Sequence, residues 1–365
     1  MLTSKNSLTA VILAGGPGTR LQPHTDNTPK PMVPVLNKPF LEHTVNYLKK
    51  YNIQSIIATL NYLPEVVQNY FGDGTRHGIM LNYCLETSPM GTAGAVKNAE
   101  QFLDSSFIVL NGDIFNTDLD IADMLAFHRR QGAKATIALK WVENPSAYGV
   151  VEVNGEGRIT RFIEKPSPEQ ITTNWINAGT YILEPEVLKH VPANQHYMFE
   201  KGLFPLLLEL GEPLYGYYFN GYWLDMGTEE KYLSLNHDLL SVKVNSPLFP
   251  LIEKDAVSCE EDVIIHPDAK VVAPVLIGSN SRISQGAYIK GPAVIGPDCY
   301  VGKDAVVERA VIWQGIHIND NAVCQDMVIS NNSQLAGAGG TPDTGGRTPN
   351  LKSDRAWKRS INDDE

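Results

Sequence analysis

Aliphatic residues recur at every sixth position over one long stretch of the chain. Eight consecutive members of this series are Ile265, Val271, Ile277, Ile283, Ile289, Ile295, Val301 and Val307. A hexapeptide period predicts a parallel β-helix, in which each aliphatic side chain points into a narrow stacked core. The series slips by one residue after Val307 and continues at Ile312 and Ile318.

Before this repeat, short apolar runs alternate with segments of helical periodicity. Strands are predicted over residues 9–15, 55–60, 107–113 and 135–142. Residues 39–52 place Leu41, Val45 and Leu48 on one helical face, and LAFHRRQGA (125–133) also favours a helix. This alternation predicts an α/β domain with a mostly parallel sheet, whose ligands bind beyond the carboxyl ends of the strands.

These patterns divide the chain into four parts. An α/β domain is predicted over residues 1–238, a linker over 239–262 and the β-helix over 263–336. Residues 337–365 are rich in glycine and proline and then charged, so they have little to bury and are predicted to be a disordered tail.

Composition and charge limit the class of protein. No apolar run approaches the ~20 residues that a membrane-spanning helix needs, and the N-terminus lacks the apolar core of a signal peptide. The four cysteines are scattered, as in a reduced protein, so a cytoplasmic location is expected. The formal net charge of −11 disfavours nucleic-acid binding but allows phosphorylated small molecules, which need only a local cationic pocket.

A glycine-rich segment directly after the first predicted strand is the first candidate for chemistry. LAGGPGTRL (13–21) is followed by Pro29-Lys30-Pro31, which places Lys30 ten residues after Arg20. Glycines let the backbone approach phosphate and offer it N–H groups, while Arg20 and Lys30 add positive charge. The segment is neither a Walker A loop nor a GxGxxG fingerprint, and a glycine cluster alone also fits an ordinary tight turn.

The longer pattern resembles the sugar-phosphate nucleotidylyltransferase family, also called nucleotide-sugar pyrophosphorylases. The motifs that carry the resemblance occur in the family's order over the first ~240 residues, the size of one ordinary domain. They are LAGGPGTRLQP with TPKPMVPV, GTAGAV (91–96), LNGDI (110–114), YGVVE (148–152), FIEKP (162–166), INAGTYIL (176–183) and GYWLDMGTEEKY (221–232). The resemblance implies a Rossmann-like fold, and many members carry a C-terminal left-handed β-helix.

The family's activity is the transfer of a nucleotidyl group from an NTP to a sugar-1-phosphate with release of pyrophosphate. The resemblance implies that Arg20 and Lys30 are catalytic. It assigns nucleotide binding to Leu13, Ala14, Gly15, Gly16, Gly18, Thr19, Glu86, Gly91, Thr92, Asn111 and Gly112. It assigns the sugar and its phosphate to Gly149, Glu164, Lys165 and Asn177.

Two aspartates match the family's metal positions. Asp113 follows an apolar strand, and Asp225 stands in YWLDMG. Either alone fits a turn or a helix cap, but together they are expected to bind Mg²⁺, which takes carboxylates and phosphate oxygens.

Three alternatives remain open for the function. Within the family, GYWLDMGT with a β-helix is most similar to bacterial chains of the mannose-1-phosphate guanylyltransferase type, and residues 84–90 lack the glutamine of some uracil- and thymine-using relatives. The alternatives are a UTP- or dTTP-dependent glucose-1-phosphate enzyme, a non-catalytic regulatory subunit, and a bifunctional protein with His266 or His317 in an acyltransferase. A homo-oligomer assembled through the β-helix is also expected.

Overall fold

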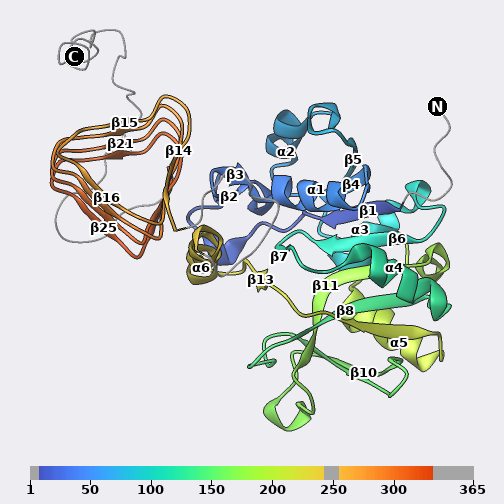
Figure 1. Cartoon of the computed structure of the whole chain (residues 1–365). Coiled ribbons are helices and arrows are strands. Elements are labelled where there is room, and N and C mark those ends of the chain that lie inside the picture. Colours follow the sequence, from blue (N-terminus) through green and yellow to red (C-terminus); the bar gives the residue numbers. More distant parts are fainter. Residues whose placement is uncertain (1–7, 242–254, 332–365) are drawn as a thin grey trace. The chain divides into compact units, whose positions relative to one another are not determined.

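The computed structural model describes residues 8–241 and 255–331, and the chain forms two compact units, Met1–Leu251 and Ile252–Glu365 (Figure 1). The first unit has an α/β architecture and the second is a parallel β-helix. The predicted tail over 337–365 lies outside the described residues, and so does most of the predicted linker. The described ends of that linker range belong to α6 (Glu229–Leu240) and β14 (Val257–Cys259).

A nine-stranded sheet organises the first unit. Its order is β10-β9-β11-β6-β1-β4-β5, with β8 paired to β11 and β12 paired to β8. In the described part of this sheet, only β10 and β11 run against the direction of the other seven strands, so it is mixed and mostly parallel. The strands are β1 (Thr9–Leu13), β4 (Ser55–Leu60), β5 (Met80–Leu85), β6 (Phe107–Asn111), β8 (Ala135–Trp141), β9 (Gly149–Val153), β10 (Ile159–Glu164), β11 (Trp175–Leu183) and β12 (Leu214–Tyr218).

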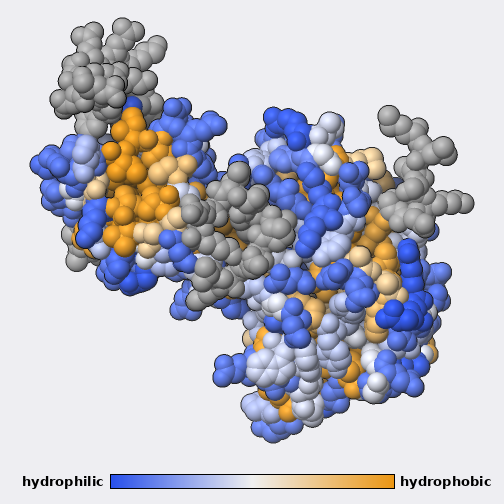
Figure 2. All heavy atoms as spheres, in the orientation of Figure 1, coloured by the Kyte–Doolittle hydropathy of each residue, from blue (hydrophilic) through white to orange (hydrophobic). Residues whose placement is uncertain are grey.

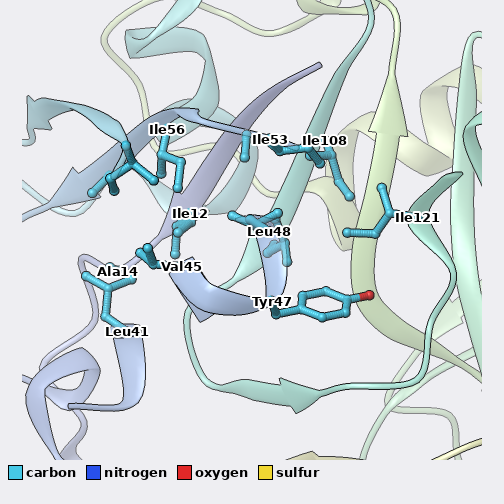
Figure 3. Packing of buried hydrophobic residues seen from close by; sticks show 14 of the residues in the cluster. Ile12, Ala14, Leu41, Val45, Tyr47, Leu48, Ile53, Ile56, Ile108 and Ile121 are labelled. Atoms are coloured by element: carbon cyan, nitrogen blue, oxygen red, sulfur yellow. The ribbon is translucent and has the colours of Figure 1, made fainter. Parts of the chain in front are cut away.

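Helices follow the central strands, as the alternation of apolar runs predicts. They are α1 (Phe40–Lys50), α2 (Pro64–Phe71), α3 (Gly91–Asn98), α4 (Ile121–Arg130), α5 (Phe204–Glu209) and α6. The predicted apolar face of α1 is confirmed, because Leu41, Val45 and Leu48 are fully buried and pack with Ile12 of β1 and Ile56 of β4 (Figure 3).

Both faces of the sheet are covered, which explains why its central strands are continuously apolar. Side chains alternate between two core clusters along β1: Ala10 and Ile12 lie in one, and Val11 lies in the other. The chemistry is therefore confined to the ends of the strands, where the apolar runs stop.

A small two-stranded sheet lies at this edge. It pairs β7 (Ile114–Asn116) antiparallel with β13 (Trp223–Asp225) and places Asp225 opposite Ile114. Two segments far apart in the sequence thus meet directly after Asp113.

The second unit is built from three parallel sheets of short strands. The hexad residues stack as predicted: Val271 pairs with Ile289 and Ile289 with Val307, and the last two are fully buried. One sheet contains β14, β17 (Val275–Ile277), β20 (Ala293–Ile295), β23 (Val311–Ile312) and β26 (Val328–Ile329). A second contains β15 (Ile264–Ile265), β18 (Arg282–Ile283), β21 (Tyr300–Val301) and β24 (His317–Ile318), and the third contains β16 (Lys270–Val272), β19 (Tyr288–Lys290), β22 (Val306–Glu308) and β25 (Val323–Gln325).

The slip after Val307 falls at a corner of the β-helix. Lys290 pairs with Glu308 and Val294 pairs with Val311, so three residues including Pro292 separate the paired positions in one turn and only two in the next. The shorter corner turns at Arg309 with φ 47°. Stacking continues across the slip, because Ile295 still pairs with Ile312 and Val301 with Ile318. Figure 2 shows hydrophobic residues gathered on one face of this unit.

Candidate active site

A cleft lies at the carboxyl ends of β1 and β6. Two adjoining cavities of about 330 and 220 Å³ form it, and both are lined by Gly16, Pro17, Lys30 and Asp113. Among the predicted site residues, Leu13, Ala14, Gly15, Glu86, Gly91, Thr92, Asn111 and Gly112 line the larger cavity. Gly18, Thr19 and Arg20 line the smaller one.

The floor of the cleft is formed where β1 and β6 end side by side. The Gly112 N–H donates to the carbonyl oxygen of Leu13 at 2.8 Å. A Cβ added at Gly112 would lie 2.3 Å from that oxygen, so only glycine permits the two turns to approach this closely. The two loops therefore present backbone to one shared space, as binding of phosphate requires.

Two cations line the cleft. The Nζ of Lys30 lies 2.8 Å from Asp113 Oδ2, and Lys30 is only 9% exposed. Arg20 belongs to a short 3-10 helix (Thr19–Leu21), and its guanidinium lies against Gly227, where an added Cβ would be 2.9 Å from Nη1. Lys30 thus brings positive charge to both cavities and Arg20 to the smaller one.

The two predicted metal carboxylates are brought to the same edge of the sheet. The Met226 N–H donates to the carbonyl oxygen of Asp113 at 2.9 Å, and Asp225 is the last residue of β13. Within residues 8–241 and 255–331, no group of three or more His, Cys, Asp or Glu side chains could hold a metal by itself. Asp113 lines both cavities, whereas Asp225 lines neither and stands two residues before Gly227, which lines the smaller one. This pair fits Mg²⁺, which usually takes one or two carboxylates and completes its shell with water and substrate phosphate.

Glu86 lies at the other end of the larger cavity. Its Oε2 accepts a hydrogen bond from the Met90 N–H at 2.9 Å, and its Oε1 faces Gly15. Burial raises the pKa of Glu86, and the hydrogen bonds from Met90 and Thr59 oppose this effect.

The segment that carries Gly91 and Thr92 is fixed by a distant part of the chain. Backbone hydrogen bonds join Tyr197 to Met90 and to Gly94. This contact brings His196 and Met198 into the lining of the larger cavity. Neither residue could be predicted from the sequence, since both lie in no recognisable motif.

The four residues predicted to contact the sugar and its phosphate do not line the two cavities. Gly149 and Glu164 are cross-strand partners in β9 and β10, and the Lys165 N–H donates to the carbonyl oxygen of Tyr148 at 3.0 Å. Burial raises the pKa of Glu164, and the negative charge of Glu200 raises it further.

Asn177 is connected to the larger cavity by a chain of hydrogen bonds. Its Nδ2 donates to the Tyr181 hydroxyl at 2.9 Å, and that hydroxyl donates to Glu200 Oε1 at 3.5 Å. Glu200 Oε2 then accepts from the Thr92 hydroxyl at 2.9 Å. Glu200 lies in a π-helical turn (Phe199–Leu203), and burial raises its pKa. The structure thus joins the two groups of predicted residues through a carboxylate that the sequence did not reveal.

The two histidines of the β-helix have local partners. The His317 ring stacks on Tyr300 with centroids 4.5 Å apart, and His266 Nδ1 accepts a hydrogen bond from the Asp268 N–H. In the described ranges, no helix is long and apolar enough to cross a membrane.

Comparison with known proteins covers both units. Residues 9–242 match the Nucleotidyl transferase family, and residues 271–338 match the GMPPB C-terminal domain. A UTP–glucose-1-phosphate uridylyltransferase of Synechocystis is 35% identical, with 88% of this chain and 86% of the relative covered. A mannose-1-phosphate guanylyltransferase of Mycobacterium tuberculosis is 33% identical, with 87% and 82% covered. The crystal structure of HddC from Yersinia pseudotuberculosis, complexed with GMP-PN, is 29% identical with a TM-score of 0.55, covering 64% of this chain and 99% of HddC.

Proposed function

The chain belongs to the nucleotidyl transferase family, and from this premise we propose that it transfers the nucleotidyl group of an NTP to a hexose-1-phosphate. In this reaction a phosphate oxygen of the sugar-1-phosphate attacks the α-phosphorus of the NTP. The bond from the α-phosphorus to the bridging oxygen breaks, and pyrophosphate leaves. Attacker and target are both anionic, so the enzyme has to neutralise charge and hold the groups in line.

The residues of the cleft fit these tasks. The backbone N–H groups of the glycine-rich loop, with Arg20 and Lys30, would bind the phosphates of the NTP. Lys165 would hold the phosphate of the sugar, with Gly149, Glu164 and Asn177 around the ring. The attacking oxygen already carries charge, so no side chain has to act as a general base.

Asp113 and Asp225 would hold Mg²⁺ against the substrate phosphates. When bound, the ion supplies Lewis-acid stabilisation of the charge on the phosphate oxygens. The aspartates themselves position the ion, and Lys30 balances the charge of Asp113 beside it.

The position of the Glu86 carboxylate in the lining of the larger cavity is the observation that favours GTP as the nucleotide. A carboxylate only accepts hydrogen bonds, and it offers about four lone pairs. Guanine presents two adjacent donors, N1–H and the 2-amino group, whereas uracil and thymine present a single N–H between two carbonyl acceptors. A half-buried carboxylate in the lining of the larger cavity therefore suits guanine better than either pyrimidine.

The sugar is proposed from the relatives. The Mycobacterium tuberculosis protein is described as a mannose-1-phosphate guanylyltransferase, and HddC was crystallised with GMP-PN. These descriptions agree with Glu86 and favour GTP and mannose-1-phosphate as substrates and GDP-mannose as product. The name of the Synechocystis relative supports the alternative of UTP and glucose-1-phosphate.

Pyrophosphate release tests the proposal. The full chain with Mg²⁺ is assayed with each of five NTPs and a panel of hexose-1-phosphates, and GTP with mannose-1-phosphate is expected to give the highest kcat/KM. Glu86→Gln should reduce the preference for GTP over UTP by about 5- to 150-fold, the equivalent of ~1–3 kcal/mol for a bidentate base contact.

The matched control is Glu65→Gln, which replaces an exposed carboxylate on α2 and should leave the preference for GTP over UTP unchanged. A wild-type preference for UTP or dTTP would overturn the guanine assignment. Absence of pyrophosphate release with every pair would instead support a regulatory role.

A further inference from the structure

Lys231 connects two parts of the proposed site. It lies in the first turn of α6, and its Nζ is 3.2 Å from Asp225 Oδ2. The same Nζ donates to the Tyr148 hydroxyl at 3.0 Å and lies 5.4 Å from the centroid of the Tyr148 ring. One ammonium group thus contacts a carboxylate and an aromatic residue that come from separate segments.

The helix alone does not favour a cation at this position. The partial positive charge at a helix N-terminus attracts acidic side chains and repels basic ones. Glu229 and Glu230, the first two residues of α6, follow this preference, and Lys231 opposes it. Its contacts with Asp225 and Tyr148 offset the repulsion between the ammonium group and the helix N-terminus, so these two contacts account for a lysine at this position.

Tyr148 is tied to the residues proposed for the sugar-1-phosphate. Its carbonyl oxygen accepts the Lys165 N–H at 3.0 Å, and Gly149 follows it in the chain. Its ring packs edge-on against Trp223, with centroids 5.5 Å apart, and Trp223 shares β13 with Asp225. A shift of Tyr148 would therefore move the backbone that carries Gly149 and Lys165.

Lys231 differs from Lys30 in its access to the cleft. Lys30 lines both cavities and is paired with Asp113, whereas Lys231 lines neither of them. This placement favours a role through Asp225 and Tyr148 over direct contact with the NTP phosphates.

We infer that Lys231 is a positioning residue that couples the divalent-cation carboxylate Asp225 to the sugar-phosphate segment at Tyr148. The inference rests on the proposed function. Binding of sugar-1-phosphate fixes the position of Tyr148, and through Lys231 it also fixes the position of Asp225. Sugar-1-phosphate and the divalent cation therefore each strengthen the binding of the other, since coupling between two sites is reciprocal.

The coupling is measured directly by Mn²⁺ binding. The full chain is titrated with Mn²⁺ by electron paramagnetic resonance, with and without mannose-1-phosphate. In the wild type the sugar phosphate should tighten Mn²⁺ binding by about 5-fold or more, a usual size of coupling. Lys231→Met should bring this ratio close to 1 and raise the KM for sugar-1-phosphate while leaving the KM for NTP within about 2-fold.

Two further variants separate coupling from a loss of folding. Lys231→Arg keeps a donor for both partners and should retain most of the coupling, and Tyr148→Phe should lower it by removing the hydroxyl. Lys50→Met is the control, because Lys50 also lies 5.4 Å from a tyrosine ring centroid but contacts neither Asp225 nor Tyr148.

A folded Lys231→Met protein with the wild-type ratio would overturn the inference, and so would a Tyr148→Phe protein with that ratio if Lys231→Met fails to fold. A wild-type protein that shows no effect of sugar phosphate on Mn²⁺ and no pyrophosphate release would instead overturn the proposed function.

Discussion

The backbone N–H of Met226 donates a hydrogen bond to the carbonyl oxygen of Asp113. This single bond, together with the pairing of β7 and β13, brings Asp225 to the end of the strand that precedes Asp113. The separation of the backbones at Asp113 and Asp225 is therefore fixed by backbone hydrogen bonds.

Conversion of either aspartate to asparagine tests the metal site. Asp113→Asn or Asp225→Asn should lower kcat by about 10²- to 10⁴-fold, because a Lewis acid contributes several kcal/mol to stabilisation of transition-state charge. The backbone bonds that join the two segments remain, so the thermal unfolding midpoint should change little. Pyrophosphate release in saturating Mg²⁺ and circular dichroism measure the two effects.

The control for the two aspartate variants is Asp104→Asn, which replaces an exposed carboxylate and should keep full activity. Near-native turnover of Asp113→Asn or Asp225→Asn would show that the replaced carboxylate does not hold the metal.

The roles of the cations can be separated kinetically. Lys165 is assigned to the sugar phosphate, and Arg20 and Lys30 to the NTP. Lys165→Ala should raise the KM for sugar-1-phosphate by at least about 10-fold, equivalent to ~1.4 kcal/mol of lost charge-assisted binding, and the KM for NTP much less. Initial rates with each substrate varied in turn give both constants, and equal increases would contradict the division of roles.

Buried histidines predict how stability depends on pH. Burial lowers the pKa of His43 below its ordinary value of 6.5, although its ring bonds to the Val35 carbonyl oxygen, and burial also lowers the pKa of His128. Below about pH 6.5 the unfolded chain therefore binds more protons than the folded one, and the free energy of unfolding falls as the pH falls.

Urea unfolding at pH 7.5 and 5.5 measures this effect. His43→Gln removes one titrating group and should reduce the loss of stability over this interval, by no more than the ~1.4 kcal/mol per pH unit that one proton can contribute. His128 and the buried carboxylates titrate in both proteins, so the difference between the proteins isolates His43. An unchanged loss in the variant would rule out His43 as a source.

The β-helix core can be tested at one position of the hexad series. Ile289 is fully buried between Val271 and Val307, so Ile289→Ala should cost about 2–5 kcal/mol in the unfolding of its unit. Lys290→Ala is the matched control, because the neighbouring residue has a half-exposed side chain and makes a surface ion pair with Glu308, and exposed ion pairs contribute little to stability. Similar urea midpoints for the two variants would contradict the stacked core.

The sequence contained much of the fold because burial imposes a period on it. Ile277 and Ile295 could be assigned to a stacked core without coordinates, since inward positions of a β-helix accept little else. The strand before Asp113 was equally clear, because it is apolar until the cleft begins.

Other parts of the site depend on contacts that no local pattern encodes. His196 enters the cavity through the backbone bonds of Tyr197, and Glu200 is recognisable only when Thr92 and Tyr181 are seen beside it. A lysine in a helix, such as Lys231, is usually an ordinary solvent-exposed residue. Asp225 lies six residues before Lys231 and Tyr148 begins the YGVVE motif, but only the folded unit shows that Lys231 contacts both of them.

The shorter corner at Arg309 indicates where the β-helix can accommodate changes in sequence length. This corner is one residue shorter than the corresponding corner of the preceding turn, and the described strands after it stay paired with those of that turn. Length at this corner is thus free to vary, whereas length within a strand is fixed by the inward side chains. A change of one residue in length should therefore be accommodated at this corner better than inside a strand, whereas a longer insertion would displace the buried Ala310 and the ion pair of Arg309 with Asp326.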